Sequence, residues 1–236
     1  MPRSAAVRET AARARKILAI LEKAHPEARC ALTHEDPFEL AVATILSAQC
    51  TDARVNQVTP GLFARYRNAE ALAAAESLEL EALIRSTGFF RAKARNLVNF
   101  AKVLVKDHGG AVPRKMEDLV LLPGIGRKTA NVVLGHAFGI EEGIAVDTHV
   151  LRVSNRLGIA KGTDPVKVEQ QLMAEIPKKL WTRTTDILIF HGRKVCDARK
   201  PLCGICPVYS LCRFQGKAAF AGSAPKKAKA SPRARA

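Results

Sequence analysis

Four cysteines near the C-terminus are the densest group of potential metal ligands in the sequence. They are spaced Cys196-x6-Cys203-x2-Cys206-x5-Cys212, so four thiolates fall within 17 residues. Four thiolates hold either a tetrahedral zinc ion or a [4Fe–4S] cluster. Zinc sites usually pair two CxxC turns, and only Cys203 and Cys206 form such a turn. The spacing by itself leaves both metals open.

A second candidate feature is the glycine-rich turn Pro123-Gly124-Ile125-Gly126 between two stretches of helical periodicity. Glycine lets a backbone approach a ligand closely. A helix that begins near Arg127 presents unpaired N–H groups at the positive end of its dipole, which suits a phosphate. Arg127 and Lys128 add positive charge beside it. The alternative is an ordinary helix–turn–helix corner.

Lys128 and Asp147 are the residues best suited to covalent and acid–base chemistry. A lysine is a nucleophile only as the neutral amine, and partial burial beside a cation such as Arg127 favours that form. Asp147 follows 19 residues later, after two glycines that allow the chain to turn back. Each residue also has a structural interpretation, as a phosphate contact and as the N-cap of a helix beginning at Thr148.

Composition points to a polyanionic partner. The 236 residues contain 38 Lys and Arg against 22 Asp and Glu, for a net charge of +16 and a pI of about 10.0. Residues 217–236 carry +6 and residues 1–16 carry +4, which leaves +6 on the rest. An excess of this size favours nucleic acid as the partner. An aromatic content of 5% argues against a β-sandwich and against a stacking surface for single strands.

The patterning between the two basic ends is helical. We expect helices over an apolar stripe ending near His25, from Pro37, from Thr51 or Asp52 to Tyr66, from Asn68 to Ile84, over 91–106, 116–122 and 127–138, from Pro165, and over 181–190. Strand signals are nearly absent, so the expected fold class is all-α. Residues from about Lys217 are rich in Ala, Lys and Pro, and we expect disorder there.

No stretch of 18 apolar residues is present, so no transmembrane helix is expected. The N-terminus is Arg-rich but contains Glu9 and Glu22, unlike a transit peptide. We expect a cytoplasmic, nucleoid-associated chain with reduced thiols, in which clustered cysteines bind metal. Cys30 and Cys50 lie far from that group and are expected to be small buried hydrophobes.

The motifs in combination resemble the helix-hairpin-helix DNA glycosylases, and most closely the endonuclease III family. The resemblance covers about residues 17–215. It is carried by four segments, 46–52 (LSAQCTD), 122–130 (LPGIGRKTA), 145–150 (AVDTHV) and 191–193 (HGR).

The resemblance implies a bifunctional DNA glycosylase and abasic-site lyase of base excision repair that removes oxidised pyrimidines from duplex DNA. Lys128 matches the family's nucleophile, which attacks the sugar C1′ and forms a Schiff base before β-elimination. Asp147 matches the catalytic aspartate, which deprotonates the lysine or stabilises positive charge on the sugar. Relatives that only remove a base lack the lysine, and the 8-oxoguanine branch lacks the cysteines.

The resemblance also assigns the cofactor and the DNA contacts. The 6-2-5 spacing is that of the family's [4Fe–4S] cluster, with Cys196, Cys203, Cys206 and Cys212 as ligands and a structural role in ordering the following loop. Gln49 matches the residue that fills the hole left by a flipped base. Phe89 takes the place of an opposite-strand wedge that is often aliphatic in the family, and Phe90 is the alternative. The remaining expected DNA contacts are Gly124, Ile125, Gly126, Arg127, His149, Arg199 and Lys200. His136 and His191 are expected to be structural.

We expect a monomer of two lobes whose partner is double-stranded DNA with damaged bases or abasic sites. Residues 30–140 form a helical barrel with the hairpin, and residues 141–216 form the cluster domain. Residues 1–29 supply a basic arm and a helix that packs on the cluster domain, and 217–236 form the tail. The cleft between the lobes holds Lys128 and Asp147. The competing interpretations are a non-catalytic zinc module that binds DNA and an iron–sulfur redox protein.

Overall fold

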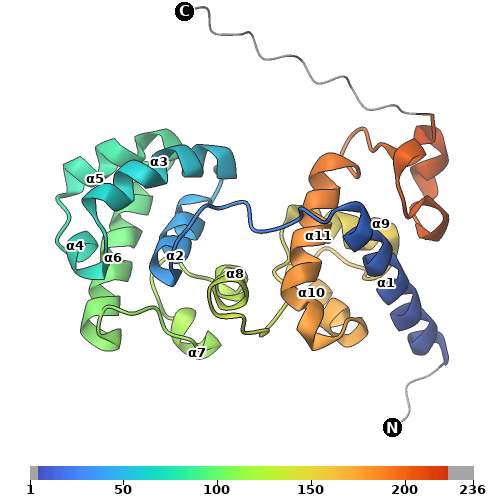
Figure 1. Ribbon diagram of the computed structural model, residues 1–236, viewed down its shortest axis with the longest axis horizontal. Helices are drawn as coiled ribbons and strands as arrows, with labels where there is room; N and C mark the ends of the chain where they lie inside the picture. Colours follow the sequence, from blue (N-terminus) through green and yellow to red (C-terminus); the bar gives the residue numbers. More distant parts are fainter. Residues whose placement is uncertain (1–4, 223–236) are drawn as a thin grey trace, which may run out of the picture.

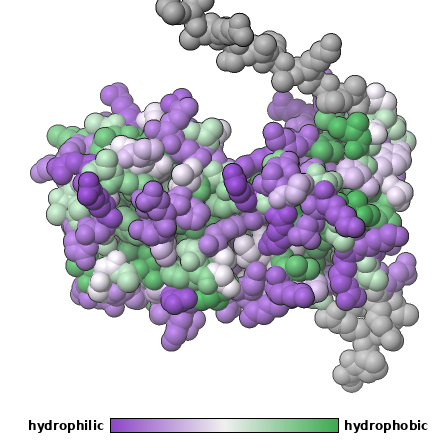
Figure 2. All heavy atoms as spheres, viewed as in Figure 1, coloured by the Kyte–Doolittle hydropathy of each residue, from purple (hydrophilic) through white to green (hydrophobic). Residues whose placement is uncertain are grey.

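The computed structural model describes residues 5–222, and every regular element in that range is helical (Figure 1). The helices form two lobes, each with its own hydrophobic core. The chain starts in one lobe, crosses to the other, and returns. The N-terminal helix therefore packs beside segments from the C-terminal half. Hydrophilic side chains are spread over the visible face of both lobes (Figure 2).

The first lobe is formed by residues 37–138. Its helices are α2 (Pro37–Leu46), α3 (Asp52–Arg65), α4 (Ala69–Ala73), α5 (Ser77–Ile84), α6 (Phe90–His108), α7 (Met116–Leu119) and α8 (Arg127–Phe138), with a 3₁₀ turn η1 (Arg85–Thr87). Helix α2 is buried along almost its whole length and packs against α3, α6 and α8. The sequence of α2 is almost continuously apolar because the helix is enclosed on all sides.

The second lobe combines both ends of the described chain. Its helices are α1 (Ala5–Ala24), α9 (Thr148–Leu157), α10 (Pro165–Glu175) and α11 (Trp181–Lys194), with the short 3₁₀ turns η2 (Lys178–Leu180), η3 (Cys203–Ile205), η4 (Tyr209–Leu211) and η5 (Gln215–Phe220). The apolar stripe of α1, including Ile17 and Leu21, packs with Val150, Leu172 and Leu188 in one core. This packing explains why residues so distant in sequence form one lobe.

Two expectations about the elements were wrong. The segment from Asn68 to Ile84 is two helices, because the chain leaves helical geometry over Ala74–Glu76 before α5 begins. The segment from Lys217 belongs to η5, where the Lys217 ammonium donates to the carbonyls of Tyr209 (2.9 Å) and Cys212 (2.6 Å). The rest of the predicted tail, 223–236, lies outside the described residues. No helix within 5–222 is long and apolar enough to cross a membrane.

Candidate active site and cluster site

A cavity of about 650 Å³ lies between the two lobes, and both Lys128 and Asp147 line it. Its walls come from the 27–34 segment, the end of α2, the start of α3, helix α8 and helix α11. The two residues singled out for chemistry are brought together by elements of different lobes. Lys128 is supplied by α8 of the first lobe and Asp147 by the start of α9 in the second.

Lys128 is the second residue of α8 and is exposed. The N-cap residue of α8 is Gly126, which provides no side chain to cap the first N–H groups. The first turn of a helix leaves these donors unpaired, and they carry the positive end of the helix dipole. Lys128 therefore stands at a site suited to a phosphate and on the rim of a cavity. The hairpin sequence predicts this placement, but the partial burial expected for Lys128 is wrong, because its side chain lies exposed on the first turn of α8.

Asp147 is both the N-cap of α9 and a wall residue of the cavity. Its Oδ1 accepts a hydrogen bond from the Val150 N–H at 2.8 Å. A capping carboxylate is held in one orientation, so the structural and chemical interpretations of Asp147 are compatible.

Arg127 is not the free cation beside Lys128 that the sequence predicts. Its guanidinium forms a two-pronged ion pair with Glu169, at 2.9 and 3.1 Å, and Asn131 donates to the same carboxylate at 2.8 Å. The hydrogen bond to Glu169 raises the pKa of Arg127. Arg127 therefore joins α8 to α10 across the lobes, and it is neither a free phosphate contact nor an uncompensated cation beside Lys128.

Ile125 also differs from its expected role. Its side chain is buried, and its N–H donates to the Leu122 carbonyl at 3.0 Å, so it holds the hairpin together. Gly124 has a φ of +83°, which favours glycine, and a Cβ there would contact Ile45 and Asn96 at 3.4–3.5 Å. Of the predicted hairpin contacts, Gly124 and Gly126 are exposed.

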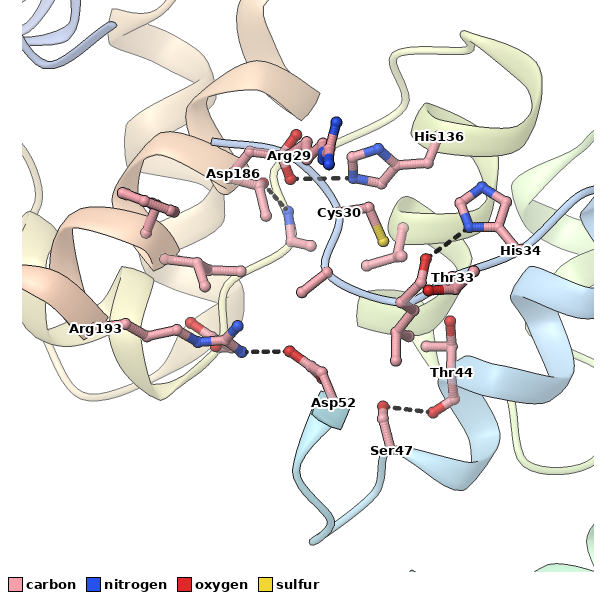
Figure 3. Close-up of a pocket in the computed structure, with 18 of the residues that line it drawn as sticks. Arg29, Cys30, Thr33, His34, Thr44, Ser47, Asp52, His136, Asp186 and Arg193 are labelled. Carbon is pink, nitrogen blue, oxygen red and sulfur yellow. Dashed lines mark hydrogen bonds and ion pairs between the residues drawn. The ribbon is translucent and has the colours of Figure 1, made fainter. Parts of the chain in front are cut away.

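Two polar pairs across the cavity were not predicted from the sequence. His136 of α8 and Asp186 of α11 are 3.2 Å apart, and Arg193 of α11 lies 2.8 Å from Asp52 at the start of α3 (Figure 3). Asp52 and Arg193 both fall within segments that carry the family resemblance, which is the only signal the sequence offers for them. The pairs join the two lobes and give the cavity a polar wall.

Cys30 is a wall residue of this cavity and is partly buried against the first core (Figure 3). Burial raises the pKa of its thiol to about 11. Cys50 is partly buried against the first core.

Gln49 and Phe89 are the two non-glycine residues with positive φ within 5–222, at +52° and +49°. Gln49 is exposed in the turn between α2 and α3. Phe89 precedes α6 and is 67% exposed, whereas Phe90 is partly buried against the core. Exposure therefore separates the two phenylalanines and favours Phe89 as the one that reaches a partner.

The four C-terminal cysteines border one small cavity, and none of them is in a disulfide. Arg156 donates to the Cys196 sulfur at 3.5 Å, and the His191 ring nitrogen Nε2 lies 3.6 Å from the Cys206 sulfur. Burial raises the pKa of the Cys206 thiol to about 11. A thiolate in this position needs a positive partner, so the donor set fits a metal-containing group. No group of three or more Cys, His, Asp or Glu side chains within 5–222 is arranged for a single metal ion.

The loop after Cys196 is held by its own hydrogen bonds. The Asp197 carboxylate accepts from the N–H groups of Lys200 (2.8 Å) and Arg199 (2.9 Å), which lowers its pKa. Arg156 donates to the carbonyls of Asp197 and Ala198 at 2.6 and 2.7 Å. The side chains of Arg199 and Lys200 are exposed.

His149 and His191 differ in their surroundings. His149 is half-buried, its Nδ1 accepts from Arg152 at 3.1 Å, and burial lowers its pKa. His191 is buried, and its Nδ1 lies 3.0 Å from Nε2 of His25. Burial lowers the pKa of His191 to about 3.

Two protein families match this sequence. The family described as HhH-GPD superfamily base excision DNA repair protein matches residues 42–178, and the iron–sulfur binding domain of endonuclease III matches residues 196–212. Endonuclease III of Synechocystis sp. is 56% identical over 200 residues, which is 85% of this chain and 91% of that protein. Endonuclease III of Bacillus subtilis is 52% identical over 189 residues, covering 80% and 86%.

Solved structures give the same result. An endonuclease III in a non-covalent complex with DNA superimposes with a TM-score of 0.83 at 48% identity, covering 87% of this chain and 96% of that one. A trapped covalent intermediate of endonuclease III with DNA gives a TM-score of 0.82 at 48% identity over the same shares of the two chains.

Proposed function

This chain belongs to the HhH-GPD superfamily of base excision DNA repair proteins, within its endonuclease III family, and from this premise we propose how its residues divide the reaction. The chain is a DNA glycosylase and abasic-site lyase that binds DNA, works through a lysine Schiff base and holds a [4Fe–4S] cluster. The observation that carries the proposal is the cavity between the lobes, which Lys128 and Asp147 both line.

Lys128 is the proposed nucleophile. Its neutral amine attacks C1′ of the damaged nucleotide, and the bond from C1′ to the base breaks with the electron pair leaving on the base. The attached nitrogen then gives up a proton, and O4′ takes up a proton as the C1′–O4′ bond breaks, which opens the sugar ring. The open-chain iminium between C1′ and the lysine nitrogen makes the C2′ proton acidic. Loss of that proton expels the 3′ phosphate oxygen, which cuts the strand 3′ to the lesion. The unpaired N–H groups at the start of α8 bind a neighbouring phosphate and hold the sugar near the amine.

Asp147 is proposed to accept the ammonium proton of Lys128 or to stabilise positive charge on the sugar as the base leaves. The cap hydrogen bond to Val150 uses Oδ1 and fixes the carboxylate at the cavity wall. This arrangement keeps the charge oriented before the substrate arrives, so little reorganisation is needed during the reaction.

The proposed substrate is duplex DNA with an oxidised pyrimidine or an abasic site, and the proposed active form is a monomer associated with the nucleoid. A base must leave the duplex to meet Lys128, and a cavity of about 650 Å³ has room for it. Gln49 fills the vacated position, and Phe89 separates the bases of the opposite strand. His149, Arg199, Lys200, Gly124 and Gly126 are proposed to contact the DNA.

Cys196, Cys203, Cys206 and Cys212 are the proposed cluster ligands. When bound, the cluster supplies a fixed point that orders the polypeptide between its ligands. This chain's own hydrogen bonds complete that order, because Arg156 and Asp197 fix the backbone that presents Arg199 and Lys200. Two exposed cations on a rigid loop suit a backbone phosphate.

A cleavage assay on matched duplexes tests the proposed substrate. The duplexes carry thymine glycol, 8-oxoguanine, an abasic site or an undamaged pair in one sequence context. We expect strand cutting at thymine glycol and at the abasic site, with a product that ends in an unsaturated sugar. Preferential release of 8-oxoguanine would contradict the proposed pyrimidine specificity. A cut abasic site with thymine glycol left intact would reduce the proposal to a lyase.

A further inference from the structure

Two strained residues lie at the tips of two different loops. Gln49 belongs to the turn 47–51 after α2, and Phe89 belongs to the segment 87–89 before α6. Both have a φ near +50°, a conformation that L-residues other than glycine adopt at a cost. Such strain persists only where the surroundings enforce it.

One buried side chain bonds both loops. The ammonium of Lys93 donates to the carbonyl of Leu46 at 2.8 Å and to the carbonyl of Thr87 at 2.8 Å. The backbone N–H of Lys93 also donates to the carbonyl of Phe89 at 3.1 Å. Leu46 immediately precedes the turn that carries Gln49, and Thr87 is two residues before Phe89. A single residue on α6 thus sets the distance between the bases of the two loops.

The burial of Lys93 is costly, and no ion pair within residues 5–222 offsets it. The residue is 5% exposed, and desolvation lowers its pKa. Its two hydrogen-bond acceptors are backbone carbonyls at the ends of α2 and η1, where helices leave carbonyls without an intrahelical donor. A cation suits the negative end of a helix dipole. An apolar residue would fill the same volume but would bond to neither carbonyl.

We propose that Lys93 is a positioning residue that fixes Gln49 and Phe89 relative to each other, so that both enter the duplex as one rigid unit. The inference rests on the proposed roles of Gln49 and Phe89 in the flipped state. Lys93 touches neither the substrate nor the reacting atoms. Its removal therefore impairs the entry of the two loops into duplex DNA and leaves the bond-breaking steps at Lys128 in place.

The test compares cutting of an abasic site in duplex DNA with cutting of the same site in a single strand, which has no base pair to open. Lys93→Met keeps the apolar length and removes the donors. We expect the ratio of duplex to single-strand rates to fall about tenfold. The loss of a hydrogen bond from a charged donor changes a rate or an equilibrium constant by about this factor. Both rates come from one preparation, so the ratio does not depend on the folded fraction.

Lys102→Met is the matched control. Lys102 lies nine residues along the same helix, on its opposite, exposed face, and its replacement removes the same charge. The ratio should stay at the wild-type value in this variant. Lys93→Arg keeps charged donors and should restore most of the ratio. Should Lys93→Met fail to fold, Lys93→Gln retains one neutral donor and should shift the ratio in the same direction.

A fluorescence measurement reports the loops directly. A 2-aminopurine placed opposite the abasic site brightens when the base loses its stacking, and Lys93→Met should reduce that change while Lys102→Met should not. An unchanged ratio and an unchanged signal in Lys93→Met would overturn the inference. Gln49→Ala and Phe89→Ala serve as references in both assays. If neither of them lowers the ratio, the proposed roles of those two residues are wrong, which is a separate failure.

Discussion

At the scale of single residues, the site depends on side chains that serve the fold and the chemistry together. Asp147 caps α9 through Oδ1 and also forms part of the cavity wall. Lys128 stands in the first turn of α8, at the positive end of the helix dipole, which suits a phosphate. The start of α8 therefore positions Lys128, and the start of α9 positions Asp147.

Asp147→Asn separates the two tasks of this residue. Asparagine caps a helix about as well as aspartate, so the free energy of unfolding should change by less than about 0.5 kcal/mol. The negative charge is lost, and release of a damaged base should slow at least about 100-fold. Chemical denaturation and a single-turnover glycosylase assay measure the two effects. A large loss of stability with a normal rate of base release would show that Asp147 is only a cap.

Short stretches of sequence predict the helix starts that carry Lys128 and Asp147, but they do not predict the ion pairs around them. The hairpin glycines and the helix that follows them can be read from a few consecutive residues, and so can the cap at Asp147. The partners His136 and Asp186 are 50 positions apart, and Asp52 and Arg193 are still more distant. Nothing in a single sequence states which of many polar residues meet when two lobes pack. The same reason explains why Arg127 was interpreted as a free cation.

At the scale of elements, a small polar network holds α8 against α10. Glu169 accepts from Arg127 and Asn131, and the backbone of Gly143 lies directly beside them. A Cβ at Gly143 would come within 2.1 Å of a Glu169 carboxylate oxygen and 2.7 Å of the Asn131 amide. Close packing at the interface between the lobes therefore requires glycine at position 143, because Glu169 and Asn131 leave no room for a Cβ.

Gly143→Ala should lower the free energy of unfolding by about 1–3 kcal/mol, because the added methyl displaces a buried, hydrogen-bonded pair. Gly61→Ala is the matched control, since nothing lies within 4 Å of a Cβ in that exposed position of α3. Alanine there should raise stability by about 0.5–1 kcal/mol. Urea unfolding curves of the two variants should therefore shift in opposite directions. A shift to higher stability in both would contradict the packing argument.

Elements with strong end signals were predicted well. Four helices begin where their residue types indicate, at Pro37, Thr51, Asn68 and Asp164 with Pro165. The break between α4 and α5 was missed because Ala74, Ala75 and Glu76 are all good helix formers. Packing of the two short helices against α6 decides the break. Propensity is a weak guide when tertiary contacts oppose it.

At the scale of the whole molecule, the net charge of +16 gives the chain a general attraction to DNA that is independent of the lesion. The described part of the C-terminus is tied down as far as η5, where Lys217 bonds the backbone beside the cluster cysteines. A test of the basic C-terminus therefore begins after Gly222. Residues 223–236 hold five cations and no acid.

Deletion of residues 223–236 should weaken binding to undamaged DNA and flatten its salt dependence. If all five cations contact phosphates, the slope of log K against log salt should become less steep by about 4.5. Turnover at saturating lesion DNA should persist, because the cavity is complete without these residues. Titrations at several salt concentrations measure the slope. An unchanged slope would show that these cations do not contact DNA.

The two lobes meet at the cavity, and the proposed reaction depends on covalent attack by Lys128 there. Borohydride reduction traps a lysine that has formed a Schiff base with a sugar. An abasic-site duplex makes the measurement direct, because the base is already absent and only the attack on C1′ is required. Lys128→Gln keeps much of the side-chain length and has no nucleophilic amine.

Trapping on the abasic-site duplex, with wild type and Lys128→Gln compared at equal occupancy of the DNA, is the decisive measurement. The wild type should give a covalent complex, and the variant should bind the duplex with similar affinity and give none. A covalent complex that persists at the wild-type level in Lys128→Gln would place the nucleophile elsewhere and contradict the assignment of this cavity as the active site.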